Sequence, residues 1–500
     1  MNVIFVLCDT LRRDHCGPYH GGLPLNQRWS AEQPDWVVPT PNLDRLAARG
    51  TVFDNCYSGS YPCMPARRDI YTGRYEFLRR GWGPLEEDDL DLPRQVSGPP
   101  NQSLTKQRQE GRPISYLATD HFHLWEQGAG NYHHGYSGFE FIRGLEADAW
   151  KTDPVQFPCP TAELLSKNER HYRNMFLTRH SEEDYTVARL MTHAADWLRR
   201  NHTHDSFYLH LDCFPPHEPW DPPEELIKLF DPEGYLEGWT GAVRYDKWRN
   251  HYTERQLRNI QARYAANVVL VDRWLGPLLG AMDELDLWSN TLLILTTDHG
   301  TFNGDYGRIG KMQTHMHEPI SHTPFIVCHP TLGHGERREQ LVQLVDVYPT
   351  VLSALGRPCP PDLDGVDLLP VMADPAARTR ESAVTGMFGQ SVTFTDGEWI
   401  LHQSPVAGNQ PLNWYGHCLA KFLHYNLGPY ENGRRKVTDC RFEQPTWLSN
   451  KKSDPCELEN LVGSRPEKLH EMQAALAAKL QDLAAPPEQL LRLGLQEFAH

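Results

Sequence analysis

MNVIFVLCD, residues 1–9, is the stretch that decides the fold. Residues 3–8 form an unbroken apolar run, which predicts a strand buried on both faces, as strands are in a parallel sheet. Asp9 follows this run directly. Because ligands in open α/β sheets bind beyond the carboxyl ends of the strands, the sequence places a carboxylate where a functional site is expected.

Three further predicted strands end in the same way, in titratable side chains. They lie at residues 114–119, 207–211 and 292–297. The side chains that follow them are, in order, His121 and His123, His217 in a Pro-rich loop, and Asp298 with His299. One such strand end is weak evidence, whereas four at equivalent positions indicate a shared site.

Amphipathic helical patterns alternate with these strands. They cover residues 40–50, 187–200 and 259–285, and the last has apolar residues at spacings of three and four. Alternating strands and helices predict an α/β fold with a large mixed, mostly parallel sheet sandwiched by helices. The side chains at the strand ends are then expected to meet at one edge of this sheet.

The sequence pattern changes after about residue 375. Short alternating segments predict strands at residues 383–387, 392–395 and 399–402, and Asp396-Gly397 is typical of a hairpin turn between the last two. A helical pattern follows near the end of the chain. We therefore expect a large domain over residues 1–375 and a smaller α+β domain with an antiparallel sheet over residues 376–500.

The composition excludes several classes of partner. Lys and Arg number 49 against 65 Asp and Glu, a net charge of −16, which suits neither nucleic acid nor an anionic membrane surface. The sequence contains no run of about twenty apolar residues, so it predicts no membrane-spanning segment. The first residues lack a signal-peptide pattern, and the 11 Cys residues are scattered, so we expect a cytoplasmic protein with reduced thiols.

The sharpest local motif is Cys63-Met64-Pro65-Ala66-Arg67, with Thr72-Gly73-Arg74 after it. Pro65 suits the first turn of a helix, which would put Cys63 near a helix N-terminus. The helix dipole and Arg67 would favour an anion at that position. The alternative is that Cys63 is a small buried apolar residue without a chemical role.

This Cys-x-Pro-x-Arg motif resembles the signature of the type I sulfatases, in the alkaline phosphatase superfamily. Similar motifs continue in the family's order along nearly the whole chain: the opening strand with Asp9, TPNLDRLAARG at 40–50, PHEPWDPP at 216–223, TTDHG at 296–300, GKM at 310–312, VDVYPTVLSALG at 345–356 and DPCELENL at 454–461. The resemblance implies hydrolysis of a sulfate ester to an alcohol and inorganic sulfate. It also implies one divalent metal ion, and a maturation enzyme that oxidises Cys63 to formylglycine.

The resemblance assigns roles residue by residue. The implied metal ligands are Asp9, the oxidised Cys63, Asp298 and His299. The implied catalytic residues are Cys63 as nucleophile, Arg67 to neutralise it, His123 as the base for sulfate release, and His217 and Lys311 to contact sulfate and protonate the leaving oxygen. Expected substrate contacts are His121, Thr10 and Trp220, the last by stacking on a sugar or aryl group, with a place in the core as its alternative.

Three positions depart from the family pattern. Thr10 stands where many sulfatases have a second aspartate, His121 where many have lysine, and Ala66 where serine is commoner. Such features also occur in phosphonate monoester and phosphodiester hydrolases, which leaves that activity as the alternative, and a catalytically silent relative as a further one. The ligand types favour Ca²⁺, with Mn²⁺ as the alternative.

The remaining expectations concern substrate and assembly. The substrate is expected to be a small anionic ester of a sugar, an aryl alcohol or an alkyl alcohol. His315, His317 and His322 raise the question of a second metal, against which we favour pocket lining or surface positions. The segment at residues 405–448 is irregular in sequence and is a candidate interface between subunits. The sequence therefore does not exclude an oligomer.

Overall fold

The computed structural model describes residues 1–28, 33–126, 130–156, 162–234, 241–311, 314–417 and 426–498. Met312 of the GKM motif and residues 418–425 of the segment at 405–448 lie outside the described residues.

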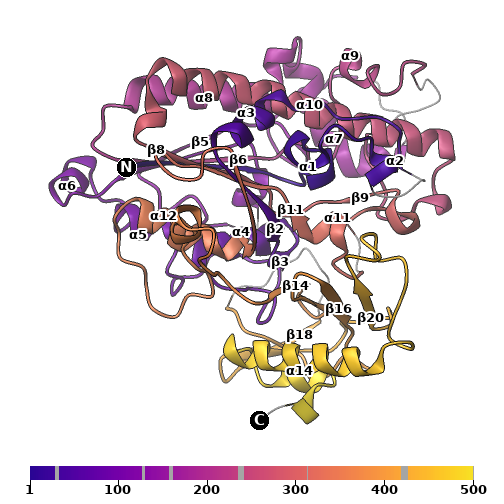
Figure 1. Cartoon of the computed structure of the whole chain (residues 1–500). Coiled ribbons are helices and arrows are strands. Elements are labelled where there is room, and N and C mark those ends of the chain that lie inside the picture. The colour runs from indigo at the N-terminus through magenta and orange to yellow at the C-terminus, as the bar shows by residue number, and fades with distance from the viewer. Residues whose placement is uncertain are drawn as a thin grey trace.

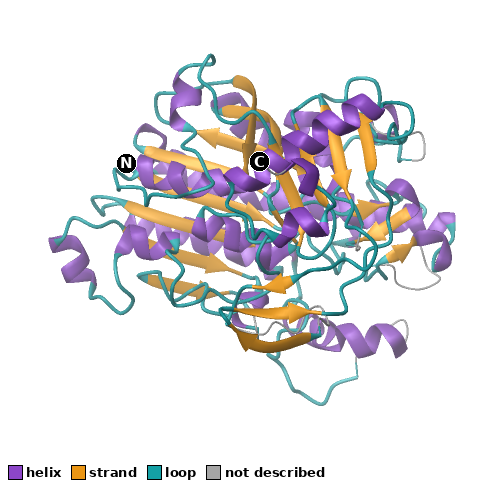
Figure 2. Cartoon of the chain, turned by 90° about the horizontal axis from the view of Figure 1, so that it is seen from below, coloured by secondary structure: helices purple, strands orange, loops and turns teal. Residues whose placement is uncertain are grey.

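A mixed sheet forms the centre of the molecule (Figures 1 and 2). In the described part of the chain it has nine strands, in the order β11-β2-β12-β8-β1-β6-β4-β5, with β13 paired to β2. The parallel strands are β8 (Thr291–Thr296), β1 (Asn2–Cys8), β6 (Phe207–Cys213), β4 (Ile114–Thr119) and β5 (Gly138–Phe141). Next to them lie β12 (Phe325–Cys328), β2 (Thr51–Tyr57), β11 (His322–Thr323) and β13 (Glu336–Gln343). The expected α/β fold is confirmed, and the four predicted strands match within two residues.

Helices cover both faces of this sheet (Figure 1). Alternate residues of β1 point to opposite faces, so Ile4 and Val6 pack in one core and Phe5 and Leu7 in another. The first core includes α3 (Pro41–Arg49), α8 (Thr186–Asn201) and α10 (Glu254–Glu284). The second includes α4 (Cys63–Thr72), α5 (Leu92–Ser97) and α12 (Val347–Ala354). Burial on both faces explains why β1 is apolar without interruption.

The parallel strands end together, and this alignment positions the site. Leu7 of β1 pairs with Thr296 of β8 and with Asp212 of β6. The N–H of Asp9 donates to the carbonyl of Cys213 at 2.8 Å, which continues the ladder one step beyond the strand. Residues that follow these strands therefore share one edge of the sheet.

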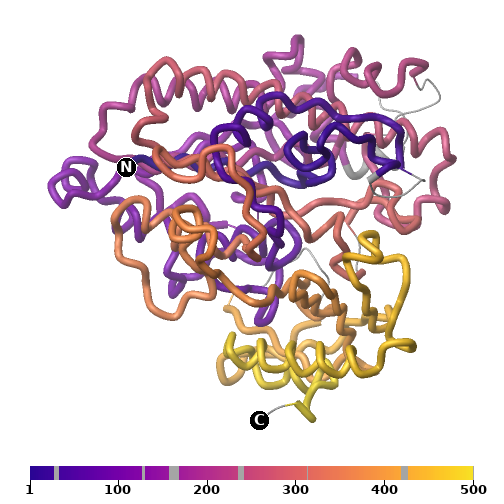
Figure 3. Tube along the Cα trace, viewed as in Figure 1, coloured from indigo at the N-terminus to yellow at the C-terminus, as the bar shows by residue number. Residues whose placement is uncertain are grey.

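A second sheet lies below the first (Figure 1), and the orange-to-yellow tube in Figure 3 shows that this region is the C-terminal part of the chain. Its order is β20-β16-β15-β14-β3, with β14 (Ala383–Met387), β15 (Val392–Thr395), β16 (Trp399–Gln403) and β20 (Trp447–Asn450) antiparallel. The fifth strand is β3 (Ser60–Tyr61), which ends two residues before Cys63. Helix α14 (Pro466–Asp482) packs on this sheet through Met472, Leu476 and Leu480. The expected smaller antiparallel sheet and late helix are confirmed.

Short elements complete the fold. Two small sheets are β7-β10-β9 and β17-β19-β18, formed by β7 (Asp246–Lys247), β9 (Phe302–Asn303), β10 (Arg308–Gly310), β17 (Asn413–Trp414), β18 (Leu427–Glu431) and β19 (Arg434–Val437). The other α-helices are α1 (Gly17–His20), α2 (Leu25–Arg28), α6 (Leu104–Gln109), α7 (Ala162–Thr178), α9 (Glu224–Ile227), α11 (Glu318–Ser321), α13 (Leu369–Ala373) and α15 (Glu488–Arg492). Among the described residues, no helix has the length and apolar content to cross a bilayer.

Candidate active site

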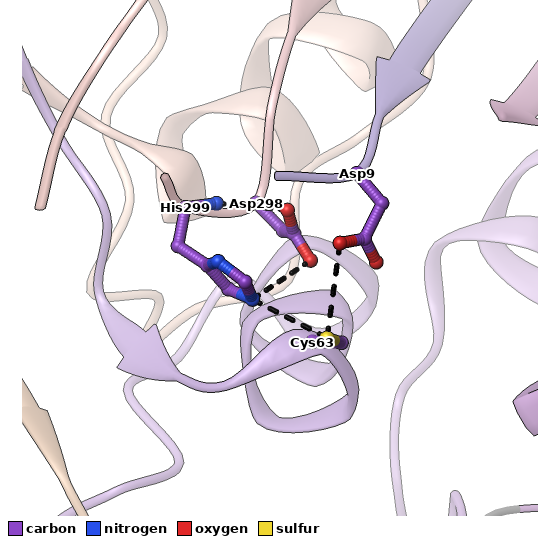
Figure 4. A group of neighbouring side chains, drawn as sticks. All are labelled: Asp9, Cys63, Asp298 and His299. Carbon is purple, nitrogen blue, oxygen red and sulfur yellow. Dashed lines mark hydrogen bonds and ion pairs between the residues drawn. The ribbon is translucent and has the colours of Figure 1, made fainter. Parts of the chain in front are cut away.

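Four side chains far apart in the sequence meet in one buried cluster (Figure 4). Asp9 follows β1, Asp298 and His299 follow β8, and Cys63 begins α4. The Cys63 sulfur lies 3.8 Å from Asp9 Oδ1 and 3.3 Å from His299 Nε2. His299 Nε2 in turn lies 3.3 Å from Asp298 Oδ2. The structure thus brings together the four residues that the sequence analysis named as metal ligands.

The donor types of this cluster fit a divalent cation. Two carboxylates, an imidazole and the Cys63 side chain place ligand atoms within 4.8 Å of one another. Asp9 Oδ2 is buried and accepts no well-directed hydrogen bond; its close cationic neighbour is Arg67, with Nη1 at 3.0 Å, so it keeps a lone pair for a metal ion. Carboxylate oxygens suit Ca²⁺ or Mg²⁺, and an imidazole is compatible with Mn²⁺.

Arg67 holds the two carboxylates of the cluster in place. Arg67 lies one helical turn after Cys63 in α4. Its buried Nη1 is 3.0 Å from Asp9 Oδ2 and 2.9 Å from Asp298 Oδ2. Its Nε and Nη2 donate to both oxygens of Asp212, at 2.8 and 2.6 Å. Burial alone would lower the pKa of Arg67, but the three carboxylates raise it well above its ordinary value, so the guanidinium stays charged. Arg67 therefore acts on the cluster by orienting its carboxylates.

The thiol of Cys63 is a poor nucleophile in this position. Burial, and next the charge of Asp9, raise its pKa well above the ordinary value, although Lys311 opposes this. A thiol must ionise to attack. The position at the start of α4 is the one expected from Pro65, yet the unmodified side chain is kept neutral there.

Lys311 supplies a cation beside Cys63. It follows β10, and its Nζ lies 3.8 Å from the Cys63 sulfur and 3.6 Å from Glu218 Oε1. Burial would lower its pKa, but the carboxylates of Glu218 and Asp9 contribute to raising it well above the ordinary value. Lys311 therefore remains an ammonium group within reach of a bound anion.

Two histidines at the site are neutral. Burial, and next the charge of Arg67, lower the pKa of His121 well below its ordinary value, and neither ring nitrogen has a hydrogen-bond partner. Burial, and next Lys311, do the same to the pKa of His217. Its Nδ1–H donates to the carbonyl of Glu218 at 2.5 Å, which leaves Nε2 without the proton. His217 is therefore no ready proton donor before substrate binds.

His123 differs from these two, because it lies between two carboxylates. Its Nδ1 is 2.5 Å from Glu126 Oε2 and its Nε2 is 2.8 Å from Glu146 Oε2. Burial would lower its pKa, but Glu146 and Glu126 raise it to about 9. His123 is thus protonated at neutral pH with both nitrogens engaged. That state does not suit the base for sulfate release that the resemblance implied.

Thr10 contacts the metal cluster rather than open space for a substrate. Its hydroxyl donates to Asp9 Oδ1 at 2.6 Å, and its N–H donates to Asp298 Oδ1 at 3.0 Å. The residue has a φ of +64°, a conformation that turns the chain sharply after β1. The expected substrate contact is therefore replaced by a positioning role for both carboxylates.

Trp220 is a core residue. It is fully buried, its ring packs edge-on against Tyr264 at 5.4 Å, and its Nε1–H donates to the carbonyl of Pro216 at 2.8 Å. The buried ring therefore has no exposed face on which a sugar or aryl group can stack. The structure agrees with the alternative, a place for Trp220 in the core.

Three site carboxylates were missed by the sequence analysis. Asp212 lies inside β6, one residue beyond the strand predicted at residues 207–211. Glu218 directly follows His217 in the PHEPW motif, so its position was a usable signal. Glu146 belongs to no motif and reaches His123 only through the fold, with a φ of +47°.

The three histidines after Lys311 do not form a metal site together. His315 contacts Ser391 and the carbonyl of Pro445, and His322 contacts Glu318. Of the three, His317 alone joins a group of possible ligands found among the described residues, with His402 and Glu457. Glu457 Oε2 already lies 3.1 Å from His317 and 2.5 Å from His402, and its Oε1 accepts from the N–H of Glu318 at 2.9 Å. This group is satisfied by its own hydrogen bonds.

Comparison with known proteins agrees with this geometry. The sulfatase family model matches residues 1–357. Arylsulfatase K of Xenopus laevis is 24% identical over 475 residues, a match that covers 88% of this chain and 77% of the relative. A phosphonate monoester hydrolase of Agrobacterium radiobacter superimposes with a TM-score of 0.63 at 20% identity, over 97% of this chain and 95% of that one.

A second solved structure contains a sugar sulfate. That neighbour was solved in complex with its substrate D-glucosamine-2-N,6-O-disulfate. It superimposes on the present chain with a TM-score of 0.66 at 16% identity, over 97% of this chain and 99% of the neighbour. At these identities the two structures establish a common fold. The family model covers more than half of the chain, and this protein therefore belongs to the sulfatase family of sulfuric ester hydrolases.

Proposed function

We propose that this protein hydrolyses a small sulfate monoester to an alcohol and inorganic sulfate, with formylglycine made from Cys63 as the nucleophile and one divalent metal ion at Asp9, Asp298 and His299. The observation that carries the proposal is the meeting of the Cys63 helix start with these ligands in one buried cluster. A maturation enzyme would carry out the oxidation. We favour Ca²⁺, because the carboxylates offer hard oxygen ligands, with Mn²⁺ as the alternative.

The two absent groups supply chemistry that the unmodified chain lacks. The metal ion would withdraw charge from an ester oxygen and raise the acidity of a hydroxyl. The aldehyde hydrate at residue 63 offers one hydroxyl to attack sulfur and a second whose deprotonation releases sulfate. Cys63 begins α4 among the predicted ligands and is the side chain that this oxidation would modify.

The remaining residues bind and orient the ester. Arg67 fixes the Asp9 and Asp298 oxygens toward the cluster, so that they need no reorganisation when a cation and substrate bind. Lys311 keeps its proton and places a donor beside residue 63, suited to an ester oxygen. His217, neutral with its Nε2 unprotonated, would accept a proton only when an anion is bound.

One experiment tests both the nucleophile and the reaction. The mass of the peptide that contains residue 63 is measured after expression with a formylglycine-generating enzyme, and we expect a loss of about 18 Da relative to the thiol. The same preparation should hydrolyse 4-nitrophenyl sulfate, and the matched Cys63→Ser variant should not. A fully modified enzyme that is inactive on every sulfate ester offered would refute the proposal and favour a silent relative.

The second candidate is phosphonate monoester or phosphodiester hydrolysis at the same site. It is favoured by Thr10, which contributes a hydroxyl where a second carboxylate is common in sulfatases, and by the neutral His121. Values of kcat/KM for 4-nitrophenyl sulfate and 4-nitrophenyl phenylphosphonate decide between the two. A phosphonate value higher by orders of magnitude would reverse the order of the candidates.

A further inference from the structure

Glu218 is a buried carboxylate that the reaction described above does not use. It lies in the Pro-rich loop after β6, and its side chain is 8% exposed. Neither Oε1 nor Oε2 has a hydrogen-bond partner among the described residues. Buried polar groups are almost always hydrogen-bonded, because leaving one unpaired is costly. An exception beside an active site therefore calls for a ligand.

The neighbours of Glu218 do not satisfy its oxygens. Lys311 Nζ is 3.6 Å from Oε1, an ion pair without a hydrogen bond. His217 Nδ1 is 3.5 Å from Oε2, but its N–H is already directed at the backbone carbonyl of Glu218, at 2.5 Å. Both carboxylate oxygens thus remain free to accept hydrogen bonds from a molecule that enters the site.

The position of Lys311 indicates which part of a substrate reaches Glu218. Its Nζ lies between the reacting side chain, with 3.8 Å to the Cys63 sulfur, and Glu218, with 3.6 Å to Oε1. A substrate whose ester oxygen contacts Lys311 would therefore bring its alcohol next to Glu218. A donor on the carbon beside the ester carbon would be placed to reach the Glu218 carboxylate.

A second carboxylate lies near the same group of residues. Glu146 pairs with His123 at 2.8 Å, and the charge of His123, with a smaller effect of Lys311, lowers its pKa to about 2 despite its burial. Its backbone has a φ of +47°, a strained conformation for a residue other than glycine and one that is found at functional sites. The carboxylates of Glu146 and Glu218 thus lie on the same side of the site. They would repel an alcohol that carries an acidic group and would attract hydrogen-bond donors.

We propose that Glu218 selects esters whose alcohol carries a hydroxyl or ammonium group on the carbon next to the ester carbon. This inference rests on the proposed hydrolysis of sulfate esters and names the substrate class within it. A sugar sulfate or an amino-alcohol sulfate meets the requirement, whereas a simple aryl or alkyl sulfate does not. Glu218 contacts the alcohol and is a residue for specificity.

A matched series of esters tests the inference with the metal-loaded, formylglycine-containing enzyme. Cyclohexyl sulfate, trans-2-hydroxycyclohexyl sulfate and trans-2-aminocyclohexyl sulfate share one ring and differ in a single donor. We expect the wild-type kcat/KM to be higher for the two donor esters by roughly 10- to 100-fold, the value of a hydrogen bond to a charged group. A larger gain for the amine would identify an ammonium as the ligand, and a larger gain for the alcohol a sugar-like hydroxyl.

Variants separate specificity from a merely structural role. Glu218→Ala should reduce the ratio of the donor esters to cyclohexyl sulfate to about one, and Glu218→Gln, which keeps one acceptor oxygen, should reduce the amine's advantage more than the alcohol's. The control is Glu224→Gln, at an exposed glutamate of α9, and it should keep the wild-type ratio. Should Glu218→Ala misfold, the Gln variant still gives both ratios.

The outcomes distinguish this inference from the proposed function. A wild-type enzyme that cleaves 4-nitrophenyl sulfate yet shows equal kcat/KM across the series would overturn the specificity role. An equal fall for all three esters in both variants would overturn it too, because Glu218 would then act only through Lys311. Failure of the wild-type enzyme on 4-nitrophenyl sulfate itself would count against the sulfatase reaction.

Discussion

Replacement of His123 by glutamine should produce a loss of stability that depends on pH. The His123 imidazole is buried between Glu146 and Glu126, which raise its pKa from 6.5 to about 9 against the effect of burial. A shift of this size corresponds to about 3 kcal/mol. Because Glu126 is 37% exposed, part of its contribution is screened by solvent, and we expect about 2 kcal/mol.

The direction follows from the raised pKa. The native state binds the proton more tightly than the unfolded chain, so the stabilisation by His123 is fully present below about pH 6.5 and is lost as the pH rises through 9. The free energy of unfolding of the wild type should therefore exceed that of His123→Gln by about 2 kcal/mol more at pH 6 than at pH 10. Titrations elsewhere occur in both proteins and cancel in this difference.

The measurement is urea unfolding followed by circular dichroism, at half-unit steps between pH 6 and 10. The matched control is His180→Gln, at an exposed histidine, and the loss of about 2 kcal/mol should be specific to His123→Gln. A difference between wild type and His123→Gln that stays constant across this range would show that the fold leaves the pKa of His123 at its ordinary value. The base role for His123 would then be open again.

Four shorter predictions concern the rest of the site. Arg67→Lys should weaken binding of the metal ion by roughly 10- to 100-fold in a metal titration, because lysine cannot bridge three carboxylates; unchanged affinity would contradict the orienting role. EDTA should abolish hydrolysis and lower the melting temperature, and Ca²⁺ or Mn²⁺ should restore both, unless the cluster binds no ion. Trp220→Ala should lower the free energy of unfolding by about 3–5 kcal/mol without raising KM, and a raised KM would reinstate its substrate contact. Thr10→Asp and His121→Lys should each lower kcat/KM, and a double-mutant cycle should give a favourable coupling of about 1–3 kcal/mol, whereas additive losses would refute a link between the two positions.

Much of the fold and of the metal cluster could be predicted from the sequence because buried parallel strands leave a strong signal. β1 and β8 are apolar over residues 3–8 and 292–295 and turn polar where they emerge at the sheet edge, towards Asp9 and Asp298. One rule of topology then brings these strand ends together. No knowledge of side-chain contacts was needed for this step.

The start of α10 shows a signal that was present but not used. The apolar pattern predicts a start at residue 259, whereas the helix begins at Glu254. Its first turn is polar, so apolar periodicity misses it. Thr253 and Gln256 form a capping box there, a local pattern that can be read from sequence alone.

The cap of α3 could not have been predicted in this way. Thr40 precedes the helix as expected, but its hydroxyl accepts from the N–H of Gly17 at 2.6 Å. The first turn is capped instead by Asp272 of α10, which accepts from the N–H groups of Asn42 and Leu43 at 3.1 and 2.8 Å. The same limit applied to His123, whose partner Glu146 adjoins it only in the folded chain. Pairings between distant segments depend on packing, which periodicity does not encode.

The two clearest departures from the family pattern are linked through Asp9. Thr10 removes a negative charge where many sulfatases have aspartate, and its hydroxyl donates to Asp9 Oδ1 at 2.6 Å. His121 removes a positive charge where many have lysine, because burial and Arg67 keep its pKa well below the ordinary value, and its Nε2 lies 3.9 Å from Asp9 Oδ2. The two changes contact opposite oxygens of one carboxylate and leave the net charge around it as it would be with both family residues. Either change alone would shift that charge by one unit in a buried site, where an unbalanced charge is costly, and this is why the positions should couple.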